Sequence, residues 1–303
     1  MPESAASNST VQRLMEDISR QQFPASALYV TATPIGNTGD ITLRALCLLT
    51  LADAIACEDT RNTSQLLARY GLSKPLIAVH EHNERERAAQ IIERLHGGER
   101  IALVSDAGTP AISDPGARLV EAVAAAGLRV IPLPGASAAI AALSASGLLD
   151  NGFHFVGFLP SKAAQRDAAL QELRALPATL VLYEAPHRIE QTVGALALAF
   201  GGERKIVIAR ELTKLFEEIH RCQLADAANW LATDKNRQRG EFVLLVEGAP
   251  VVTDTGDAEA QRVLEILLTE CTVSQAAALA AKITGQKKNR LYEHALQLKN
   301  GAC

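Results

Sequence analysis

Three segments rich in glycine and proline follow apolar runs that are typical of strands. The first, TATPIGNTGDITL at residues 31–43, places Pro34, Gly36 and Gly39 between a predicted strand and a predicted helix. Glycines there let the backbone approach a ligand, and the helix N-terminus favours a polar or anionic group. The spacing is not GxGxxG and lacks the acidic residue expected further on, which disfavours a nicotinamide dinucleotide site. A plain tight turn is the alternative interpretation.

The second segment, SDAGTPAISDPGA at residues 105–117, contains two aspartates, two glycines and two prolines. It follows a predicted parallel strand at its carboxyl end, where open α/β sheets bind ligands. Asp106 could accept hydrogen bonds from a ligand amine or ribose, and the backbone of residues 107–109 could line a nucleoside. We interpret residues 113–115, Ser-Asp-Pro, as the cap of the following helix, with proline at its first position.

The third segment, PLPGASAA at residues 132–139, is another Pro-Gly turn into a predicted helix and has Ser137 in the first turn. Three such strand ends in one domain indicate a ligand site more specifically than any one of them does. The sequence therefore predicts that they converge on one rim and form one ligand site.

Two further strand ends carry polar side chains that could line a substrate rim. They are Glu58, Asp59 and Arg61 at one end, and His80, His82 and Asn83 at the other. The two histidines are two residues apart on an extended segment, so they face opposite sides, and no third ligand is placed by the sequence. No metal site is expected.

In the second half of the chain, charged residues are concentrated where predicted strands end. They are Glu184, His187, Arg188, Arg210, Glu211 and Lys214. Such residues are either functional, or solvated turn residues and structural ion pairs, and the pattern alone leaves both open.

The hydrophobic pattern divides the chain into an N-terminal α/β domain at residues 27–150 and a second α/β domain at residues 151–248. The first has five short apolar strands alternating with helices, at residues 28–32, 53–57, 75–79, 100–104 and 128–133. This alternation predicts a mostly parallel sheet covered on both faces. The second has longer strands, at residues 153–159, 178–184, 204–211, 215–222 and 240–247. Two of them meet across a short turn near residue 211, which predicts an antiparallel pair in a mixed sheet.

The two ends of the chain are expected to differ from these domains. Residues 1–26 are polar and predict a flexible arm, and residues 249–258 form a Pro/Gly/Asp linker. Residues 259–303 predict three short helices, at 260–270, 274–282 and 287–299, in a helix-turn-helix-like arrangement. Thr272 marks a helix start and Gly285 a helix stop.

Charge is unevenly distributed along the 303 residues, whose net charge is −4. From Val273 onwards five basic residues stand against Glu293 alone, which leaves a charge of −8 on the rest of the chain. A basic tail on an acidic body indicates an anionic partner for the tail rather than nucleic acid over the whole surface.

The composition favours a cytoplasmic protein. The five cysteines are odd in number and never in CxxC spacing, so neither a disulfide framework nor a zinc site is expected. The N-terminus lacks the apolar core of a signal peptide. Residues 130–149 carry no charge, but Pro132, Pro134 and Gly135 interrupt them, which disfavours a membrane span.

The order of these motifs resembles the small-subunit ribosomal RNA cytidine 2′-O-methyltransferases of the tetrapyrrole-methylase superfamily. TPIGNTGDITLRAL, CEDTR, HEHNE, SDAGTPAISDPG, PGASA, GFLPSK, YEAPHRI, ARELTK and GEFVLLVE occur in register from about residue 28 to residue 248. The resemblance implies two α/β domains with S-adenosylmethionine in the cleft between them, a small C-terminal helical domain and a homodimer. It also implies methylation of a cytidine ribose in the decoding region of 16S ribosomal RNA.

The resemblance carries the cofactor pocket over by position. Its residues are Pro34, Gly36, Ser105, Asp106, Ala107, Gly108, Thr109, Pro110, Ser137, Ala138, Tyr183, Glu184 and Ala185. The glycine-rich first loop of the superfamily is reduced here to Gly36 and Gly39.

For catalysis, Glu184 or Glu211 is our candidate to accept or orient the proton of the attacking hydroxyl, with Lys214 as an electrostatic helper. The RNA-binding candidates are Arg61, Lys162, Arg166, Arg188, Lys287, Lys288 and Arg290. Two alternatives are a small-molecule methylase of the tetrapyrrole type and a non-enzymatic RNA-binding scaffold. The CEDTR segment and the basic tail favour RNA over a macrocycle.

Overall fold

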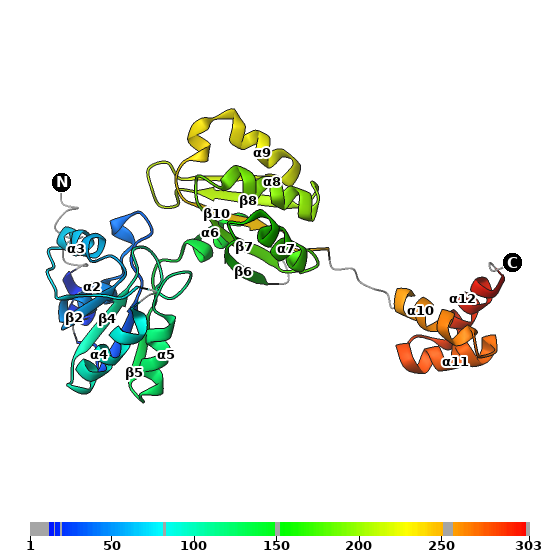
Figure 1. The fold of residues 1–303 in the computed structure, drawn as a ribbon, viewed down its shortest axis with the longest axis horizontal. Coiled ribbons are helices and arrows are strands. Elements are labelled where there is room, and N and C mark those ends of the chain that lie inside the picture. The colour runs from blue at the N-terminus through cyan, green and yellow to red at the C-terminus, as the bar shows by residue number, and fades with distance from the viewer. Residues whose placement is uncertain are drawn as a thin grey trace. The chain divides into compact units, whose positions relative to one another are not determined.

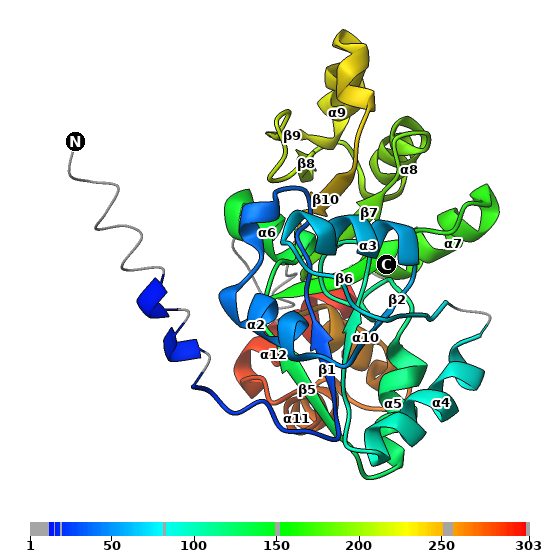
Figure 2. The same cartoon turned by 90° about the vertical axis from the view of Figure 1, so that its left-hand side faces the viewer.

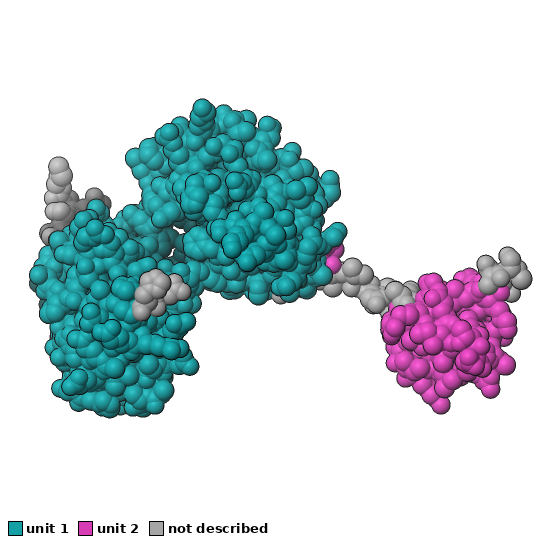
Figure 3. Space-filling model, in the orientation of Figure 1, with its two compact units in different colours: residues 1–249 teal, residues 250–303 magenta. Residues whose placement is uncertain are grey.

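The computed structural model describes residues 12–14, 16–18, 20–80, 83–148, 152–250 and 257–300. The chain forms two compact units, residues 1–249 and 250–303, which Figure 3 shows in different colours. The first unit contains both α/β sheets and the second contains the C-terminal helices (Figure 1).

The first sheet is entirely parallel, as the short apolar runs predicted. Its strands are β1 (Ala27–Thr31), β2 (Ala54–Cys57), β3 (Leu76–Ala78), β4 (Arg100–Val104) and β5 (Arg129–Leu133). The strand order is β3-β2-β4-β1-β5, so β4, β1 and β5 are neighbours. Their carboxyl ends therefore lie side by side, although they are far apart in the sequence.

Helices cover both faces of this sheet. The helices are α2 (Leu43–Leu51), α3 (Thr60–Arg69), α4 (Glu84–His96) and α5 (Ala117–Ala125), with a short 3-10 helix η1 (Thr38–Asp40) before α2. Leu48 and Leu67 of α2 and α3 pack on one face, whereas Ile91 and Leu119 of α4 and α5 pack on the other. Figure 2 shows α4 and α5 lying next to each other.

The second sheet is mixed, as predicted. Its strands are β6 (Phe153–Phe158), β7 (Thr179–Glu184), β8 (Lys205–Arg210), β9 (Glu218–Gln223) and β10 (Phe242–Val246). The order is β6-β7-β10-β8-β9, with β6 parallel to β7 and every other pair antiparallel. The predicted antiparallel pair is thus β8 and β9, but β9 begins three residues later than expected.

Helices also cover both faces of the second sheet. Those following its strands are α7 (Ala163–Leu173), α8 (Ile189–Phe200) and α9 (Leu224–Thr233), with the 3-10 helix η2 (Lys235–Gln238). Their apolar residues pack on one face. The opposite face is covered by α6 (Ala138–Ser146), whose Ala139 and Ala142 pack against Val181 and Val243. Helix α6 therefore packs on the second sheet, although it precedes the boundary near residue 150 that the sequence predicted.

Residues 23–26, which the sequence assigned to a flexible N-terminal arm, include a core residue of the first sheet. Phe23 is buried in the core against Tyr29, and its carbonyl oxygen accepts a hydrogen bond from Arg100 Nε at 2.8 Å. Tyr29 donates its hydroxyl to the carbonyl of Pro24 at 2.7 Å. Residues 23–26 thus pack with the first α/β layer, because the aromatic side chain of Phe23 fills its core.

The second unit is a three-helix bundle with its own core. Its helices are α10 (Asp257–Leu268), α11 (Val273–Thr284) and α12 (Lys288–Asn300), packed through Leu264, Ala277 and Leu291. The helix signals at Thr272 and Gly285 are confirmed. Gln275 accepts a hydrogen bond from the Thr272 N–H at 3.1 Å, and Gly285 ends α11 with φ +72°. Within the described residues, no helix is long and apolar enough to cross a membrane.

Candidate active site

The loops that follow β1, β4 and β5 are joined to one another by hydrogen bonds. Thr33 and Gly108 exchange backbone hydrogen bonds of 2.9 and 3.0 Å, and Thr33 Oγ1 donates to the Ser105 carbonyl at 3.1 Å. Thr109 Oγ1 donates to the carbonyl of Ala136 at 3.0 Å. Gly108 has φ +76°, a conformation that favours glycine, so it lets the central loop bend between the other two. The predicted convergence of the three strand ends is confirmed.

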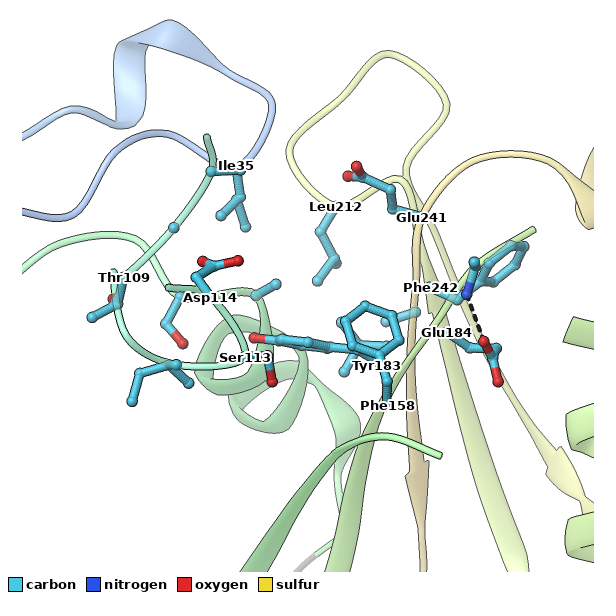
Figure 4. Close-up of a pocket in the computed structure, with 18 of the residues that line it drawn as sticks. Ile35, Thr109, Ser113, Asp114, Phe158, Tyr183, Glu184, Leu212, Glu241 and Phe242 are labelled. Atoms are coloured by element: carbon cyan, nitrogen blue, oxygen red, sulfur yellow. Dashed lines mark hydrogen bonds between the residues drawn. The ribbon is translucent and has the colours of Figure 1, made fainter. Parts of the chain in front are cut away.

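A pocket of about 390 Å³ opens between these loops and the second sheet. That volume lies in the ~300–1,000 Å³ range of cofactor and small-molecule sites. Its walls are mainly apolar, with Ile35 on one side and Tyr183, Leu212 and Phe158 on the other (Figure 4). Both sheets contribute, because the second sheet turns its α6-covered face towards the loops of the first.

Eight of the predicted cofactor residues line this pocket. They are Ala107, Gly108, Thr109, Ser137, Ala138, Tyr183, Glu184 and Ala185. Pro34, Gly36, Ser105, Asp106 and Pro110 are not among the lining residues. Asp106 is exposed and accepts a hydrogen bond from Asn62 Nδ2 at 2.7 Å, so it pairs with the start of α3.

The sequence predicted that the backbone at Gly36 approaches a ligand, but in the structure it is another loop of the protein that lies close to Gly36. A Cβ built on Gly36 would lie 2.5 Å from Lys214 Cγ and 3.0 Å from Thr213 Oγ1. Glycine is required there because the turn between β8 and β9 packs directly on the first loop. The turn and loop together close one side of the pocket, where Ile35 and Leu212 lie.

The interpretation of residues 113–115 as a helix cap is wrong. Helix α5 begins after Gly116, and no side chain of its own segment caps it. Glu84, at the start of α4, instead accepts hydrogen bonds from the N–H groups of Gly116 and Leu119, both at 3.0 Å, and it is buried. Ser113 and Asp114 line the pocket. The sequence signal of a Ser-Asp-Pro cap was present, but Glu84, 32 positions before Gly116, caps the helix instead.

Replacement of Glu84 by alanine is expected to lower the free energy of unfolding by about 2–3 kcal/mol. Two buried N–H groups at a helix N-terminus would lose a charged acceptor. Chemical denaturation would measure the loss, with Glu86→Ala as the control, since Glu86 lies exposed in the same first turn of α4. An equal effect of both substitutions would show that the cap from Glu84 contributes nothing specific.

The loop between β4 and α5 has a strained backbone. Ala111 and Ser113 have φ values of +65° and +62°, which side chains other than glycine rarely adopt. Each such residue costs on the order of 1–3 kcal/mol and persists only where the surroundings impose it. The two strained residues flank Ile112, and the second directly precedes Asp114. The side chains of Ile112, Ser113 and Asp114 all line the pocket.

The Asp114 carboxylate points into the pocket, on the side of Ile35 and the Tyr183 hydroxyl (Figure 4). Burial, together with the negative charges of Glu58 and Asp106, raises its pKa to about 6, against a hydrogen bond with Ser105 that lowers it. These residues lie at the ends of β2 and β4. The pocket thus contains a carboxyl group that changes its charge near neutral pH.

Tyr183 joins the second sheet to helix α6. Its hydroxyl accepts a hydrogen bond from the N–H of Ala139 at 3.2 Å, and its ring meets Phe155 and Phe158 edge-on at 5.1 and 5.7 Å between centroids. Burial raises the pKa of the hydroxyl, so the phenol stays protonated at neutral pH. The rings form a rigid apolar wall with one polar end inside the pocket.

Glu184 has a structural environment. Its side chain is 0% exposed and accepts hydrogen bonds from Thr192 Oγ1 at 2.5 Å and from the Ala185 N–H at 2.8 Å. Arg188 Nε lies 3.3 Å from the same carboxylate and its guanidinium also donates to the Leu159 carbonyl at 2.6 Å. Figure 4 shows the carboxylate turned away from Asp114 and from the pocket. These bonds orient the start of α8 and leave the oxygens directed away from a ligand.

Glu211 and Lys214 form a clasp in the turn between β8 and β9. Lys214 Nζ lies 2.8 Å from carboxylate oxygens of both Glu211 and Glu241, and Glu211 also accepts the Glu241 N–H at 3.0 Å. Burial raises the pKa of Glu211, but these hydrogen bonds outweigh it and leave the pKa lowered. Glu211 adopts φ +51°. The clasp fixes the turn that places Leu212 against the pocket.

Most of the polar side chains predicted to form a substrate rim bond to residues close to them in the sequence. Asp59 caps α3 through the N–H of Arg61 at 2.8 Å and pairs with the Arg61 guanidinium at 2.9 Å, which lowers the Asp59 pKa to about 2. Asn83 accepts the His80 N–H at 2.9 Å and closes the turn after β3. His82 lies outside the described residues. Among the described residues, no group of three metal-ligating side chains exists.

Two of the predicted RNA-binding arginines are not on an open surface. Arg166 is 8% exposed, and its Nε has no hydrogen-bond partner between α7 and α8. Arg188 forms an ion pair with Glu184 and donates hydrogen bonds to main-chain carbonyls. Arg166 is thus buried and the half-buried Arg188 is held by bonds within the protein, so the structure presents neither guanidinium group on an open surface. Arg61, Lys162, Lys287, Lys288 and Arg290 are exposed.

The pattern of the tetrapyrrole (corrin/porphyrin) methylases matches residues 27–228, and that of the RsmI C-terminal HTH domain matches residues 254–299. The fold agrees with solved members. Cobalt precorrin-4 methyltransferase has a TM-score of 0.55 and 18% identity over 73% of this chain and 94% of its own. Uroporphyrin-III-C-methyltransferase from Thermus thermophilus has a TM-score of 0.53 and 20% identity over 77% and 98%. The chain belongs to the tetrapyrrole methylase family, and it is a methyltransferase.

More similar relatives are named ribosomal RNA small subunit methyltransferase I. The one from Pseudomonas aeruginosa is 53% identical over 90% of this chain and 98% of its own. The one from Vibrio cholerae is 49% identical over 90% and 95%. At this identity and coverage, the chain belongs to the family of these proteins.

Proposed function

We propose that this methyltransferase uses S-adenosylmethionine to methylate the ribose 2′-hydroxyl of a cytidine in the decoding region of 16S ribosomal RNA. The observation that carries the proposal is the 53% identity to an enzyme named for small-subunit ribosomal RNA, over 98% of that enzyme's length. The similarity includes both the sheets that form the pocket and the C-terminal helices.

The residues of the pocket fit this cofactor. Ile35, Leu212 and Val243 offer apolar surface for an adenine ring and for carbons next to sulfur. Ser137 and Ala138 lie at the N-terminus of α6, where backbone N–H groups favour a carboxylate. When bound, S-adenosylmethionine supplies an activated methyl group. The chain's own contribution is to orient the acceptor hydroxyl and exclude water.

We assign positioning roles to the predicted catalytic residues. Glu184 holds the end of β7 and the start of α8 through Thr192 and Arg188. Glu211 and Lys214 hold the turn that carries Leu212. Their carboxylates are committed to bonds within the protein, so they support the walls of the pocket rather than move a proton.

The proposed RNA contacts lie in the second unit and at exposed positions of the first. Lys287, Lys288 and Arg290 are exposed at the start of α12, and Lys162 is exposed at the start of α7. Cations there would neutralise phosphates without reading bases. We further propose that the protein acts in the cytoplasm as a homodimer, which light scattering on the purified protein would test.

The direct test offers two acceptors to the purified protein with methyl-labelled S-adenosylmethionine. They are small ribosomal subunits and free ribosomal RNA, both from cells that lack the enzyme. Label in an alkali-resistant dinucleotide is expected, because a 2′-O-methyl group blocks cleavage of the next phosphodiester bond. Bound cofactor with no label in either RNA would reject the proposal and favour a small-molecule substrate.

A further inference from the structure

A groove of about 520 Å³ lies between helices α7 and α8, and it shares no lining residue with the active-site pocket. The two helices lie side by side on the face of the second sheet opposite to α6 (Figure 1). We propose that this groove binds a peptide segment of a partner protein, with Arg166 pairing to a carboxylate of that segment. This second site is independent of the methyltransferase reaction.

Arg166 is a buried cation without an anion. The residue is 8% exposed, its Nε is buried without a hydrogen-bond partner, and no described residue forms an ion pair or hydrogen bond with its side chain. Arginine does not lose its charge in proteins, so burial cannot neutralise it as it can a lysine. An unpaired charge in such surroundings is unfavourable for folding. A carboxylate from outside the chain would provide the missing partner.

The two acidic residues of the groove do not supply this partner. Asp167 is the next residue along α7, and adjacent positions of a helix do not face each other. Glu190 accepts a hydrogen bond from Gln238 Nε2 at 3.0 Å. Both acidic residues are exposed, and their charge at the groove repels the closely spaced phosphates of RNA. The groove therefore favours a single carboxylate over a nucleic-acid backbone.

Gly194 leaves open space at the groove. It lies in the middle of α8, and a Cβ built on it would meet no heavy atom within 4 Å apart from its own helix. Glycine in a helix interior is less stable than alanine, and packing within the chain does not require glycine here. Gly194 and Arg166 thus both lower the stability of the free protein, and both line the same groove. A peptide main chain that approaches α8 closely would explain the glycine.

The other side chains of the groove are complementary to a peptide. Leu198 is 91% exposed one helical turn after Gly194 and offers an apolar contact. Gln171 and Gln191 are exposed, and their amides can both donate hydrogen bonds to main-chain groups and accept them. One cation, two amides and an apolar surface together match a segment with an aspartate or glutamate between apolar residues.

The experiment titrates the full-length protein with acetyl-Leu-Glu-Leu-Leu-amide and follows the backbone amide resonances of α7 and α8 by NMR. The blocked ends leave the glutamate side chain as the only charge of the peptide. We expect a Kd of about 1 mM. The peptide acetyl-Leu-Gln-Leu-Leu-amide should bind about tenfold more weakly, because it lacks the charge-assisted hydrogen bond to Arg166.

Two substitutions should weaken peptide binding without harming the fold. Arg166→Met should remove the preference for glutamate over glutamine and should melt no lower than wild type, because an apolar chain of similar length replaces an unpaired buried charge. Gly194→Ala should raise Tm by about 2–4 °C and weaken binding of the glutamate peptide by about threefold or more. Arg118→Gln, exposed on α5, is the matched loss of one positive charge and should bind the peptide as wild type does.

Other outcomes overturn the proposal. Unchanged α7 and α8 resonances at about 10 mM peptide, or equal affinity for the two peptides, would show that the groove takes no carboxylate. An Arg166→Met protein that melts well below wild type, or does not fold, would make the guanidinium a structural group of the helix packing. Inorganic phosphate that competes with the peptide, together with a flatter salt slope of RNA binding in Arg166→Met, would assign the groove to RNA phosphates. None of these measurements depends on RNA methylation.

Discussion

Replacement of Glu184 by alanine is expected to lower the free energy of unfolding by about 3–5 kcal/mol. The carboxylate is 0% exposed and accepts from Thr192 and Ala185 while it pairs with Arg188. Alanine would leave the Arg188 guanidinium, which is itself only 17% exposed, without its anion. Removal of one partner from a buried ion pair is costly because the other charge stays buried.

The loss should extend to the pocket wall. Arg188 also donates to the carbonyl of Leu159 at 2.6 Å, directly after β6 and Phe158. Without Glu184, that guanidinium is less well oriented, and the end of β6 loses its anchor. Weaker cofactor binding is therefore expected, because Phe158 at the end of β6 lines the pocket.

Chemical denaturation of Glu184→Ala, Glu184→Gln and Glu190→Ala would measure this effect. Glutamine retains an acceptor oxygen and should lose less than alanine. Glu190 is exposed in the first turn of the same helix, so its substitution should cost less than about 1 kcal/mol. A Glu184→Ala protein of nearly wild-type stability but without activity would return Glu184 to the catalytic residues.

The second large effect is expected for the triple substitution Lys287→Gln, Lys288→Gln and Arg290→Gln. RNA affinity should fall about tenfold or more at moderate salt, and the slope of log affinity against log salt should flatten by about 2–3. Each cation that contacts a phosphate releases counterions, at ~0.7–0.9 per contact. Cofactor affinity should not change.

The position of these cations on α12 supports a binding role. Lys288 and Arg290 lie in the first turn, which has no acidic residue, and Lys287 precedes it. Positive charge at a helix N-terminus opposes the helix dipole and costs about 0.3–1 kcal/mol. The triple variant should therefore melt no lower than wild type. The helix dipole gives these cations no stabilising role, which is consistent with the proposed phosphate contacts.

A matched control removes three exposed arginines from the first unit, Arg85, Arg118 and Arg129. It makes the same change in net charge without touching α12. Affinity measured at several salt concentrations should leave this control close to wild type. Equal flattening of the salt slope in both triple variants would show a general effect of charge and no specific role for the tail.

The sequence predicted the local structure well because local chemistry dominates there. Runs of five apolar residues between helical patterns are long enough for buried parallel strands, and the first sheet follows them. Thr272 and Gly285 delimit α11 through bonds that span only a few residues. The glycine and proline segments after β1, β4 and β5 were correctly predicted to converge on one rim, since strand ends of a parallel sheet share an edge.

The tertiary structure decided which of the predicted side chains face a ligand. Asp114 was interpreted as part of a helix cap, because nothing near it in the sequence shows that Glu84 supplies that cap. Arg166 and Arg188 were interpreted as phosphate contacts, yet Arg166 is buried and the half-buried Arg188 is paired with Glu184. Burial, ion pairing and the direction of a side chain depend on residues tens of positions away. The sequence alone therefore determined the elements and the family resemblance, whereas only packing separated the groups that hold the walls from those that face the pocket.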